Sequence, residues 1–151
     1  MDERHILDVT TIEKTCFSKP WSEASIEQEF KNENAHFLVA IDHQKTIGYI
    51  GILVAAGECS VTNIAVMPEK RCQGIGTKLL DKALREARLR QDEFMTLEVR
   101  ESNTTAIKLY EKFGFERVGQ RKDYYDDPTE DALLLTKYLT AKGKKDEDTG
   151  N

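Results

Sequence analysis

A chain of 151 residues, 39% of them hydrophobic, is long enough to bury a substantial core within one domain. Its longest apolar run, residues 47–56, is much shorter than the roughly 20 residues of a transmembrane helix, and the charged N-terminus lacks the apolar segment of a secretory signal, so we expect a cytoplasmic protein without a membrane span. The formal net charge of −5 argues against a general nucleic-acid-binding protein, and the three widely spaced cysteines match neither a disulfide framework nor a metal site.

The first half of the chain predicts two helices followed by three strands. Apolar residues at helical spacing indicate a helix over residues 6–17, and Ser22 is a suitable N-cap for a second helix that ends near Phe30. Runs rich in apolar and β-branched residues predict strands at 36–41, 46–56 and 59–66. The Gly57-Glu58 pair between the last two runs predicts a hairpin turn.

The second half alternates between helical and strand patterns. Leucine and alanine at helical spacing predict a helix over residues 74–90, and a strand is predicted at 94–99. Asn103 is a predicted N-cap for a helix that ends near Phe113, Gly114 is its stop signal, and strands follow at 115–121 and 132–139. The whole pattern predicts an α/β or α+β fold over residues 1–140, a mixed sheet with helices on both faces, and a disordered polar tail over 141–151.

A glycine-rich segment joins the third predicted strand to the helix that follows it. Pro68 ends the strand, and the run from Arg71 to Gly76 reads Arg-Cys-Gln-Gly-Ile-Gly. Glycines let the backbone approach a ligand closely, and the free N–H groups at a helix start attract an anion, so the segment predicts a diphosphate site. The alternative is an ordinary glycine turn with a solvated Arg71.

Several motifs together resemble those of a known enzyme family. They are Val66-x-Pro68-x-x-Arg71-x-x-Gly74-x-Gly76, Leu97-Glu98-Val99-Arg100-Glu101-Ser102-Asn103 and Ala106-Ile107-x-Leu109-Tyr110-Glu111-x-Phe113-Gly114-Phe115. With these motifs the chain is similar to the GNAT N-acetyltransferases. Pro20-Trp21-Ser22 and Asp123-Tyr124-Tyr125 further resemble the ribosomal-protein-alanine acetyltransferases, the RimI type. The resemblance covers residues 12–139 and implies the GNAT fold and acetyl-CoA as the acetyl donor.

The resemblance also implies which residues bind acetyl-CoA. They are Ile64, Ala65 and Val66 beside the pantetheine, Arg71, Cys72, Gln73, Gly74, Ile75, Gly76 and Thr77 around the pyrophosphate, and Asn103 as a further contact. No metal is implied. The family usually has a strand before its first helix, and here that strand is predicted to be missing or very short. The edge that it leaves is compatible with a monomer or with a homodimer.

Acetyl transfer to an amine requires a base for the amine, a donor for the carbonyl oxygen and an acid for the departing thiolate. The resemblance makes Tyr110 the acid, although its spacing alone would suit a core aromatic residue. Glu98 is the candidate base, acting through a water, because it shares one strand face with Thr96 and Arg100. The alternative for Glu98 is a solvated charge or an ion pair with Arg100. The resemblance also implies that two strands splay apart beside the pantetheine, which would make the Val66 N–H group a natural donor to the thioester oxygen.

The acceptor side has the weaker sequence signal. Trp21, Tyr124 and Tyr125 are candidates to line a peptide groove, and five nearby carboxylates could attract a basic peptide: Asp123, Asp126, Asp127, Glu130 and Asp131. The alternative is an ordinary charged loop. The RimI resemblance implies the N-terminal alanine of a small-subunit ribosomal protein as the acceptor; the other possibilities are a small-molecule amine, a lysine, or a CoA-binding module without catalysis. Cys72, at the helix start, is a candidate for oxidation rather than a nucleophile.

Overall fold

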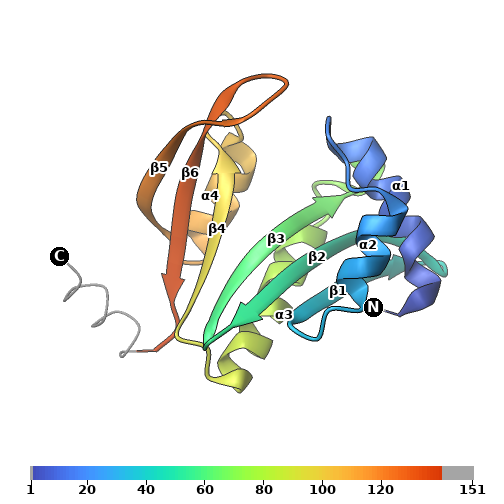
Figure 1. Cartoon of the computed structure of the whole chain (residues 1–151), viewed down its shortest axis with the longest axis horizontal. Coiled ribbons are helices and arrows are strands. Elements are labelled where there is room, and N and C mark those ends of the chain that lie inside the picture. The colour runs from blue at the N-terminus through green and yellow to red at the C-terminus, as the bar shows by residue number, and fades with distance from the viewer. Residues whose placement is uncertain (1, 141–151) are drawn as a thin grey trace. The chain divides into compact units, whose positions relative to one another are not determined.

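The structure, a computed structural model, describes residues 2–140 of the chain (Figure 1). The predicted tail over 141–151 lies outside the described residues. The elements in chain order are η1 (Glu3–His5), α1 (Ile6–Cys16), α2 (Glu23–Phe30), β1 (Ala35–Asp42), β2 (Lys45–Ala55), β3 (Glu58–Val66), η2 (Pro68–Lys70), α3 (Ile75–Arg90), β4 (Phe94–Arg100), α4 (Thr104–Lys112), β5 (Glu116–Tyr125) and β6 (Glu130–Tyr138), where η marks a 3-10 helix.

The strands form one sheet in the order β1-β2-β3-β4-β6-β5. β3 runs parallel to β4, whereas β1 pairs with β2, and β6 pairs with both β4 and β5, in the antiparallel sense. The predicted mixed sheet is therefore confirmed. Within residues 2–140 no strand precedes α1, as predicted, so β1 and β5 form the two edges.

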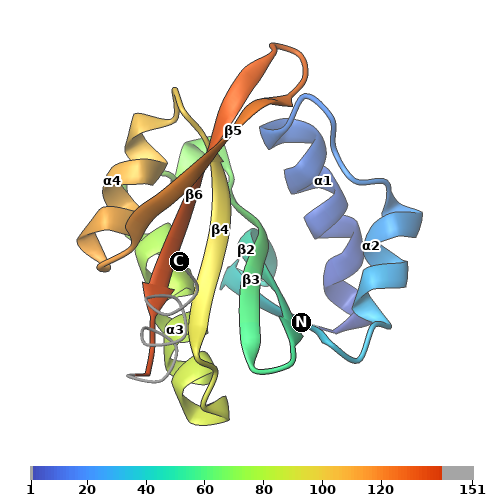
Figure 2. The same cartoon turned by 60° about the vertical axis from the view of Figure 1, so that its left-hand side comes forward.

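The described chain divides into two compact units, each held together by its own contacts. The first unit comprises residues 2–55 and 61–86, and the second comprises 56–60 and 87–140. In the first unit α1 and α2 lie on one side of the strands and α3 lies on the other, which confirms the prediction of helices on both faces (Figure 2). That residues 1–140 fold as one domain stays a prediction.

Local capping signals decide where two of the helices begin. The Ser22 side chain accepts a hydrogen bond from the backbone N–H of Ser25, and the Asn103 side chain accepts one from that of Ala106, both at 3.1 Å. Each bond satisfies one of the N–H groups that a helix start leaves unpaired. Gly114 follows α4 with a φ of 88°, the left-handed conformation expected of a glycine stop.

Two turn regions differ from the prediction. The hairpin between β2 and β3 turns at Ala56-Gly57, one residue earlier than expected, and both residues have positive φ, which matches the twist of the strands. β5 continues to Tyr125, four residues beyond its predicted end. Its pairing with β6 shifts register between Arg121 and Tyr125, and Asp123 lies there with a φ of 51°. Such a bulge breaks the alternation by which a strand is recognised in a sequence.

The core of the first unit contains a buried carboxylate that the sequence did not predict. Glu13 is 1% exposed and lies on α1 among apolar residues. Its carboxylate accepts hydrogen bonds from the Tyr49 hydroxyl, from Asn63 Nδ2 at 2.7 Å and from the backbone N–H of Trp21 at 3.2 Å. A buried charge is tolerated when donors surround it, so Glu13 joins α1, β2, β3 and the segment between α1 and α2.

The second unit is organised by the alternation of β4. Met95, Leu97 and Val99 are buried, whereas the residues between them are half-buried. The alternation places Thr96, Glu98 and Arg100 together on the opposite face, as predicted. Burial of the apolar residues of β4 therefore determines that the polar residues between them lie on the other face of the strand.

We expect Glu13→Gln to lower the free energy of unfolding by about 1.5–3 kcal/mol, the usual contribution of a hydrogen bond to a charged group. The Glu13 carboxylate accepts hydrogen bonds through both oxygens, whereas the amide of a glutamine would place an NH2 group against one of the donors and lose that bond. Chemical denaturation at neutral pH measures the change. Glu27→Gln, on an exposed position of α2, is the matched control and should change the free energy by less than about 0.5 kcal/mol. Equal effects of the two substitutions would contradict the role given to Glu13.

Candidate active site

The predicted diphosphate loop lies in the first unit, between η2 and α3. The first hydrogen bond of α3 joins the Lys78 N–H group to the Gly74 carbonyl at 3.0 Å, so the N–H groups of Ile75, Gly76 and Thr77 precede the helical ladder. The first turn of α3, all of it described, carries no acidic residue. Residues 71–74 are exposed. The loop therefore presents backbone donors and the positive end of a helix dipole to an incoming anion.

Two residues of the loop have a left-handed backbone. Gly74 has a φ of 78°, and a Cβ built on it would meet no atom within 4 Å. Cys72 has a φ of 64°, an uncommon conformation for a residue with a side chain, and its thiol is exposed. The open space around Gly74 fits the predicted close approach of a ligand to the backbone.

The Arg71 side chain is exposed but it is not simply solvated. Its Nε donates to the Val66 carbonyl at 3.0 Å, and one terminal nitrogen lies 3.4 Å from Cys16 Sγ. The Cys16 thiol also contacts the Val66 carbonyl, at 3.6 Å. Arg71 therefore binds the end of β3 through its Nε and the end of α1 through one terminal nitrogen.

The predicted pantetheine contacts Ile64, Ala65 and Val66 lie on the part of β3 that belongs to the first unit. Within that unit β2 is the only strand beside them. A strand with one neighbour leaves alternate backbone N–H and C=O groups unpaired along its other side. The pairing of β3 with β4 covers only Glu58 to Ser60, so the stretch that contains these three residues can hydrogen-bond an extended ligand on the side away from β2.

Glu98 lies in the second unit, where Arg121 and Tyr124 engage its carboxylate. Arg121 Nε is 3.2 Å from Glu98 Oε1. Hydrogen bonding to Glu98, followed by partial burial, raises the pKa of the Tyr124 phenol. The expected alternative of an ion pair with Arg100 is wrong, because the Arg100 guanidinium is bound to Glu130 and to backbone carbonyls instead. The partner comes from β5, which sequence spacing does not reveal.

Tyr110 also lies in the second unit, on the buried face of α4. Its ring is 4% exposed and packs edge-on against Phe115, with 5.7 Å between the ring centroids. Burial raises the pKa of Tyr110 well above its ordinary value, so the phenol keeps its proton at neutral pH. Among residues 2–140 the Tyr110 hydroxyl has no hydrogen-bond partner. It is not fully buried either, because the one fully buried side-chain oxygen or nitrogen without a partner in that part of the chain is Thr46 Oγ1. Solvent therefore reaches the Tyr110 hydroxyl, which is free to donate.

The predicted acceptor residues are divided between the units. Tyr124 and Tyr125 lie together in the second unit, with ring centroids 5.0 Å apart, and Tyr124 contacts the Glu98 carboxylate. Burial raises the pKa of Tyr125 to about 12. Trp21 lies in the first unit, where its backbone N–H is bound to Glu13. The structure thus brings two of the three aromatic candidates to the candidate base.

Two of the five nearby carboxylates are committed to bonds within the second unit. Glu130 accepts from the Ser102 N–H group and from Arg100, and Asp131 accepts from the Asp123 N–H group at 2.9 Å and from Gln120 at 2.6 Å. These hydrogen bonds hold the pKa of both carboxyl groups below the ordinary values. Both groups therefore stay ionised while they hold the loop, and that they attract a basic peptide stays a prediction.

Asn103 caps α4 through its side-chain oxygen, which is sufficient reason for an asparagine at this position. Its contact with the cofactor stays a prediction. In the described part of the chain no cluster of His, Cys, Asp or Glu could hold a metal ion. Among residues 2–140, none of the helices has the length and hydropathy that a membrane span requires.

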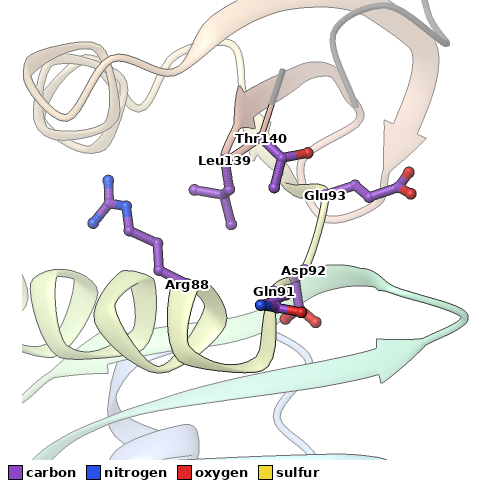
Figure 3. Close-up of a pocket in the computed structure, with 6 residues that line it drawn as sticks. All are labelled: Arg88, Gln91, Asp92, Glu93, Leu139 and Thr140. Atoms are coloured by element: carbon purple, nitrogen blue, oxygen red, sulfur yellow. The ribbon is translucent and has the colours of Figure 1, made fainter. Parts of the chain in front are cut away.

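A hollow of about 490 Å³ in the second unit holds none of the predicted site residues. Its lining residues are Arg88, Gln91, Asp92, Glu93, Leu139 and Thr140 (Figure 3). Asp92 is 2% exposed and pairs with Arg90 at 2.8 Å, and the Glu93 side chain points away from Leu139 and Arg88. The buried charge is thus already neutralised, and nothing in the hollow calls for a ligand.

Comparison with known proteins gives consistent matches over most of the chain. The model of the acetyltransferase (GNAT) family matches residues 6–115. A putative ribosomal protein bS18-alanine N-acetyltransferase of Bacillus subtilis is 39% identical over 128 residues, which cover 84% of this chain and 85% of that protein. The ribosomal protein bS18-alanine N-acetyltransferase of Haemophilus influenzae is 33% identical over 131 residues, 85% of this chain and 88% of that protein.

Solved structures agree with the sequence matches. The crystal structure of the ribosomal-protein-S18-alanine N-acetyltransferase of Escherichia coli superposes with a TM-score of 0.86 and 30% sequence identity. The match covers 93% of this chain and 91% of that structure. The similarity therefore extends over the elements that carry both the glycine loop and the β4 polar face.

We expect Gly74→Ala to weaken the binding of coenzyme A about 10-fold or more, because a Cβ would fill the space by which a ligand approaches the loop. Gly57→Ala is the matched control, since Gly57 has a φ of 79° and also has no atom within 4 Å of a built Cβ. Both substitutions should cost roughly 1–2 kcal/mol of backbone strain. Calorimetry with coenzyme A, with thermal unfolding of both variants, separates the two effects. Equal affinities of the two variants would remove Gly74 from the binding site.

Proposed function

Because the chain belongs to the acetyltransferase (GNAT) family, we propose that it transfers the acetyl group of acetyl-CoA to a protein N-terminal α-amine, that of the N-terminal alanine of ribosomal protein bS18. The observation that carries this proposal is that the bacterial relatives described above bear that activity in their names and match more than four fifths of the chain. The arrangement of the candidate site supports it, as the following steps describe.

The glycine loop supplies the cofactor site in this proposal. The pyrophosphate of acetyl-CoA binds the N–H groups at the start of α3, beside Gly74 and Gly76. The pantetheine extends along the open side of β3, and the Val66 N–H group donates to the thioester oxygen. A donor aimed at this oxygen stabilises the negative charge that develops when the amine attacks.

Glu98 acts as the general base, through a water. The α-amine has an intrinsic pKa near 8, so a carboxylate suffices to take the proton of the fraction that is charged at neutral pH. The neutral amine nitrogen then forms a bond to the thioester carbon, the carbon–sulfur bond breaks, and the sulfur leaves as a thiolate. The second proton, which the nitrogen loses on becoming an amide, passes to solvent and replaces the proton that the thiolate receives from its acid. Transfer is direct, and no enzyme nucleophile is needed.

Tyr110 acts as the general acid and protonates that thiolate. Its hydroxyl combines a firmly held proton with the absence of a competing acceptor among residues 2–140. A core tyrosine would instead be expected to bond a neighbouring group. The free hydroxyl thus favours the catalytic interpretation over the purely structural one.

The acceptor is tested by incubating the protein with acetyl-CoA and a peptide that copies the N-terminus of bS18. We expect acetylation of the α-amine, detected as the added mass of one acetyl group, and no reaction of the same peptide with its N-terminus blocked. A polyamine, an aminoglycoside and a lysine peptide with a blocked N-terminus serve as competing acceptors. Faster turnover of any of them would replace the proposed acceptor, and binding of acetyl-CoA without turnover of any amine would indicate a non-catalytic binding module.

We expect Tyr110→Phe to lower kcat by about 10²-fold or more while the KM for acetyl-CoA changes by less than about threefold, because only the leaving thiolate loses its proton donor. Steady-state kinetics with the preferred amine measure both constants. Tyr138→Phe on β6, another tyrosine packed against a phenylalanine, is the matched control and should retain kcat. An unchanged kcat for Tyr110→Phe would exclude Tyr110 from the chemistry.

A further inference from the structure

Arg100, at the end of β4, holds the turn between β5 and β6. Its two terminal nitrogens donate to the carbonyls of Pro128 and Asp126, each at 2.9 Å. Its guanidinium carbon lies 4.5 Å from the centre of the Tyr125 ring, within the range of a cation–π contact. One side chain therefore binds the turn at its backbone and at the aromatic residue that precedes it.

The same guanidinium also reaches the start of α4. Arg100 contacts Glu130 at 3.3 Å, and the other oxygen of Glu130 accepts from the backbone N–H of Ser102. Ser102 directly precedes Asn103, the N-cap of the helix that carries Tyr110. The Arg100–Glu130 pair thus connects the turn, the end of β4 and the first residues of α4 within the second unit.

The contacts of Arg100 require an arginine. The planar guanidinium has donors on separate nitrogens, so it can reach two carbonyls and a carboxylate while its face covers a ring. A lysine would keep the charge, but its single ammonium could not span the same set of acceptors. The position thus depends on the shape of the side chain as well as on its charge.

We propose that Arg100 is a positioning residue of the acceptor site, which fixes Tyr125 and the 126–130 turn in the conformation that the acceptor binds. The proposal rests on the proposed function, in which Tyr124 and Tyr125 contact the acceptor. Arg100 touches neither reacting group in this account, since Arg121 rather than Arg100 engages Glu98. Its effect is therefore expected on acceptor binding and not on cofactor binding.

The test compares Arg100→Lys with the wild type in steady-state kinetics and in hydrogen exchange. We expect the KM for the bS18 peptide to rise about 10-fold or more, kcat to change by less than about threefold, and the Kd for coenzyme A to remain within twofold. Backbone amides of residues 126–130 should exchange faster. Arg85→Lys, at an exposed ion pair with Asp81 on α3, is the matched control and should change none of these quantities.

Glu130→Gln is a second variant, which removes only one partner of Arg100 and should give a smaller rise in the same KM. An unchanged peptide KM in Arg100→Lys, with or without faster exchange, would overturn the proposal, as would an equal weakening of peptide and cofactor binding. Failure of the wild type to acetylate the peptide would refute the proposed acceptor instead. The KM and kcat of Arg100→Lys and of the wild type would then be compared with the amine that the wild type does acetylate. Inactivity of the wild type toward every amine would refute both proposals.

Discussion

The two-residue period of β4 is the constraint on which the chemistry proposed for the second unit depends. Because Met95, Leu97 and Val99 must be buried, the side chains between them point to the opposite face. That face therefore carries Glu98 and Arg100, and a slip of one residue in the register would turn both charges into the core. The pairing of β4 with β6, from Phe94 opposite Tyr138 to Arg100 opposite Ala132, fixes this register.

The two charged residues of the β4 polar face, Glu98 and Arg100, bind different partners, and the partners indicate different roles for the two residues. Glu98 contacts Arg121 and Tyr124, which are exposed side chains that an incoming amine could displace. Arg100 is bound to two backbone carbonyls and to Glu130, whose carboxylate also holds the start of α4. We infer that the first set is available for chemistry, whereas the second maintains the surrounding loops.

The sequence was sufficient for features that depend on neighbours along the chain. Ser22 and Asn103 cap their helices, Gly114 ends α4, and the alternation of β4 is present as predicted, because each depends on bonds or periodicities within a few residues. The glycine loop at the start of α3 belongs to the same class, since its donors arise from the helix start itself.

Features that depend on distant segments were not predictable in the same way. Glu13 has the spacing of the apolar face of α1, four residues after Val9, but the sequence does not show which donors would meet a carboxylate there. Tyr49 and Asn63, on strands far along the chain, supply them. The pairing of Glu98 with Arg121 depends on the order of the strands in the sheet. The extension of β5 to Tyr125 depends on a bulge opposite β6. In the first two cases the partner lies more than 20 residues away, and in the third the pairing register of two predicted strands decides, which their sequences do not show.

A crystal structure of the protein with coenzyme A and the bS18 peptide would show whether Glu98 and Tyr110 face the reacting groups. We expect the peptide α-amine beside the Glu98 carboxylate, directly or through one water, and the coenzyme A sulfur within hydrogen-bond reach of the Tyr110 hydroxyl. An amine that lies beside another carboxylate, or a sulfur whose nearest hydroxyl is not that of Tyr110, would contradict this expectation.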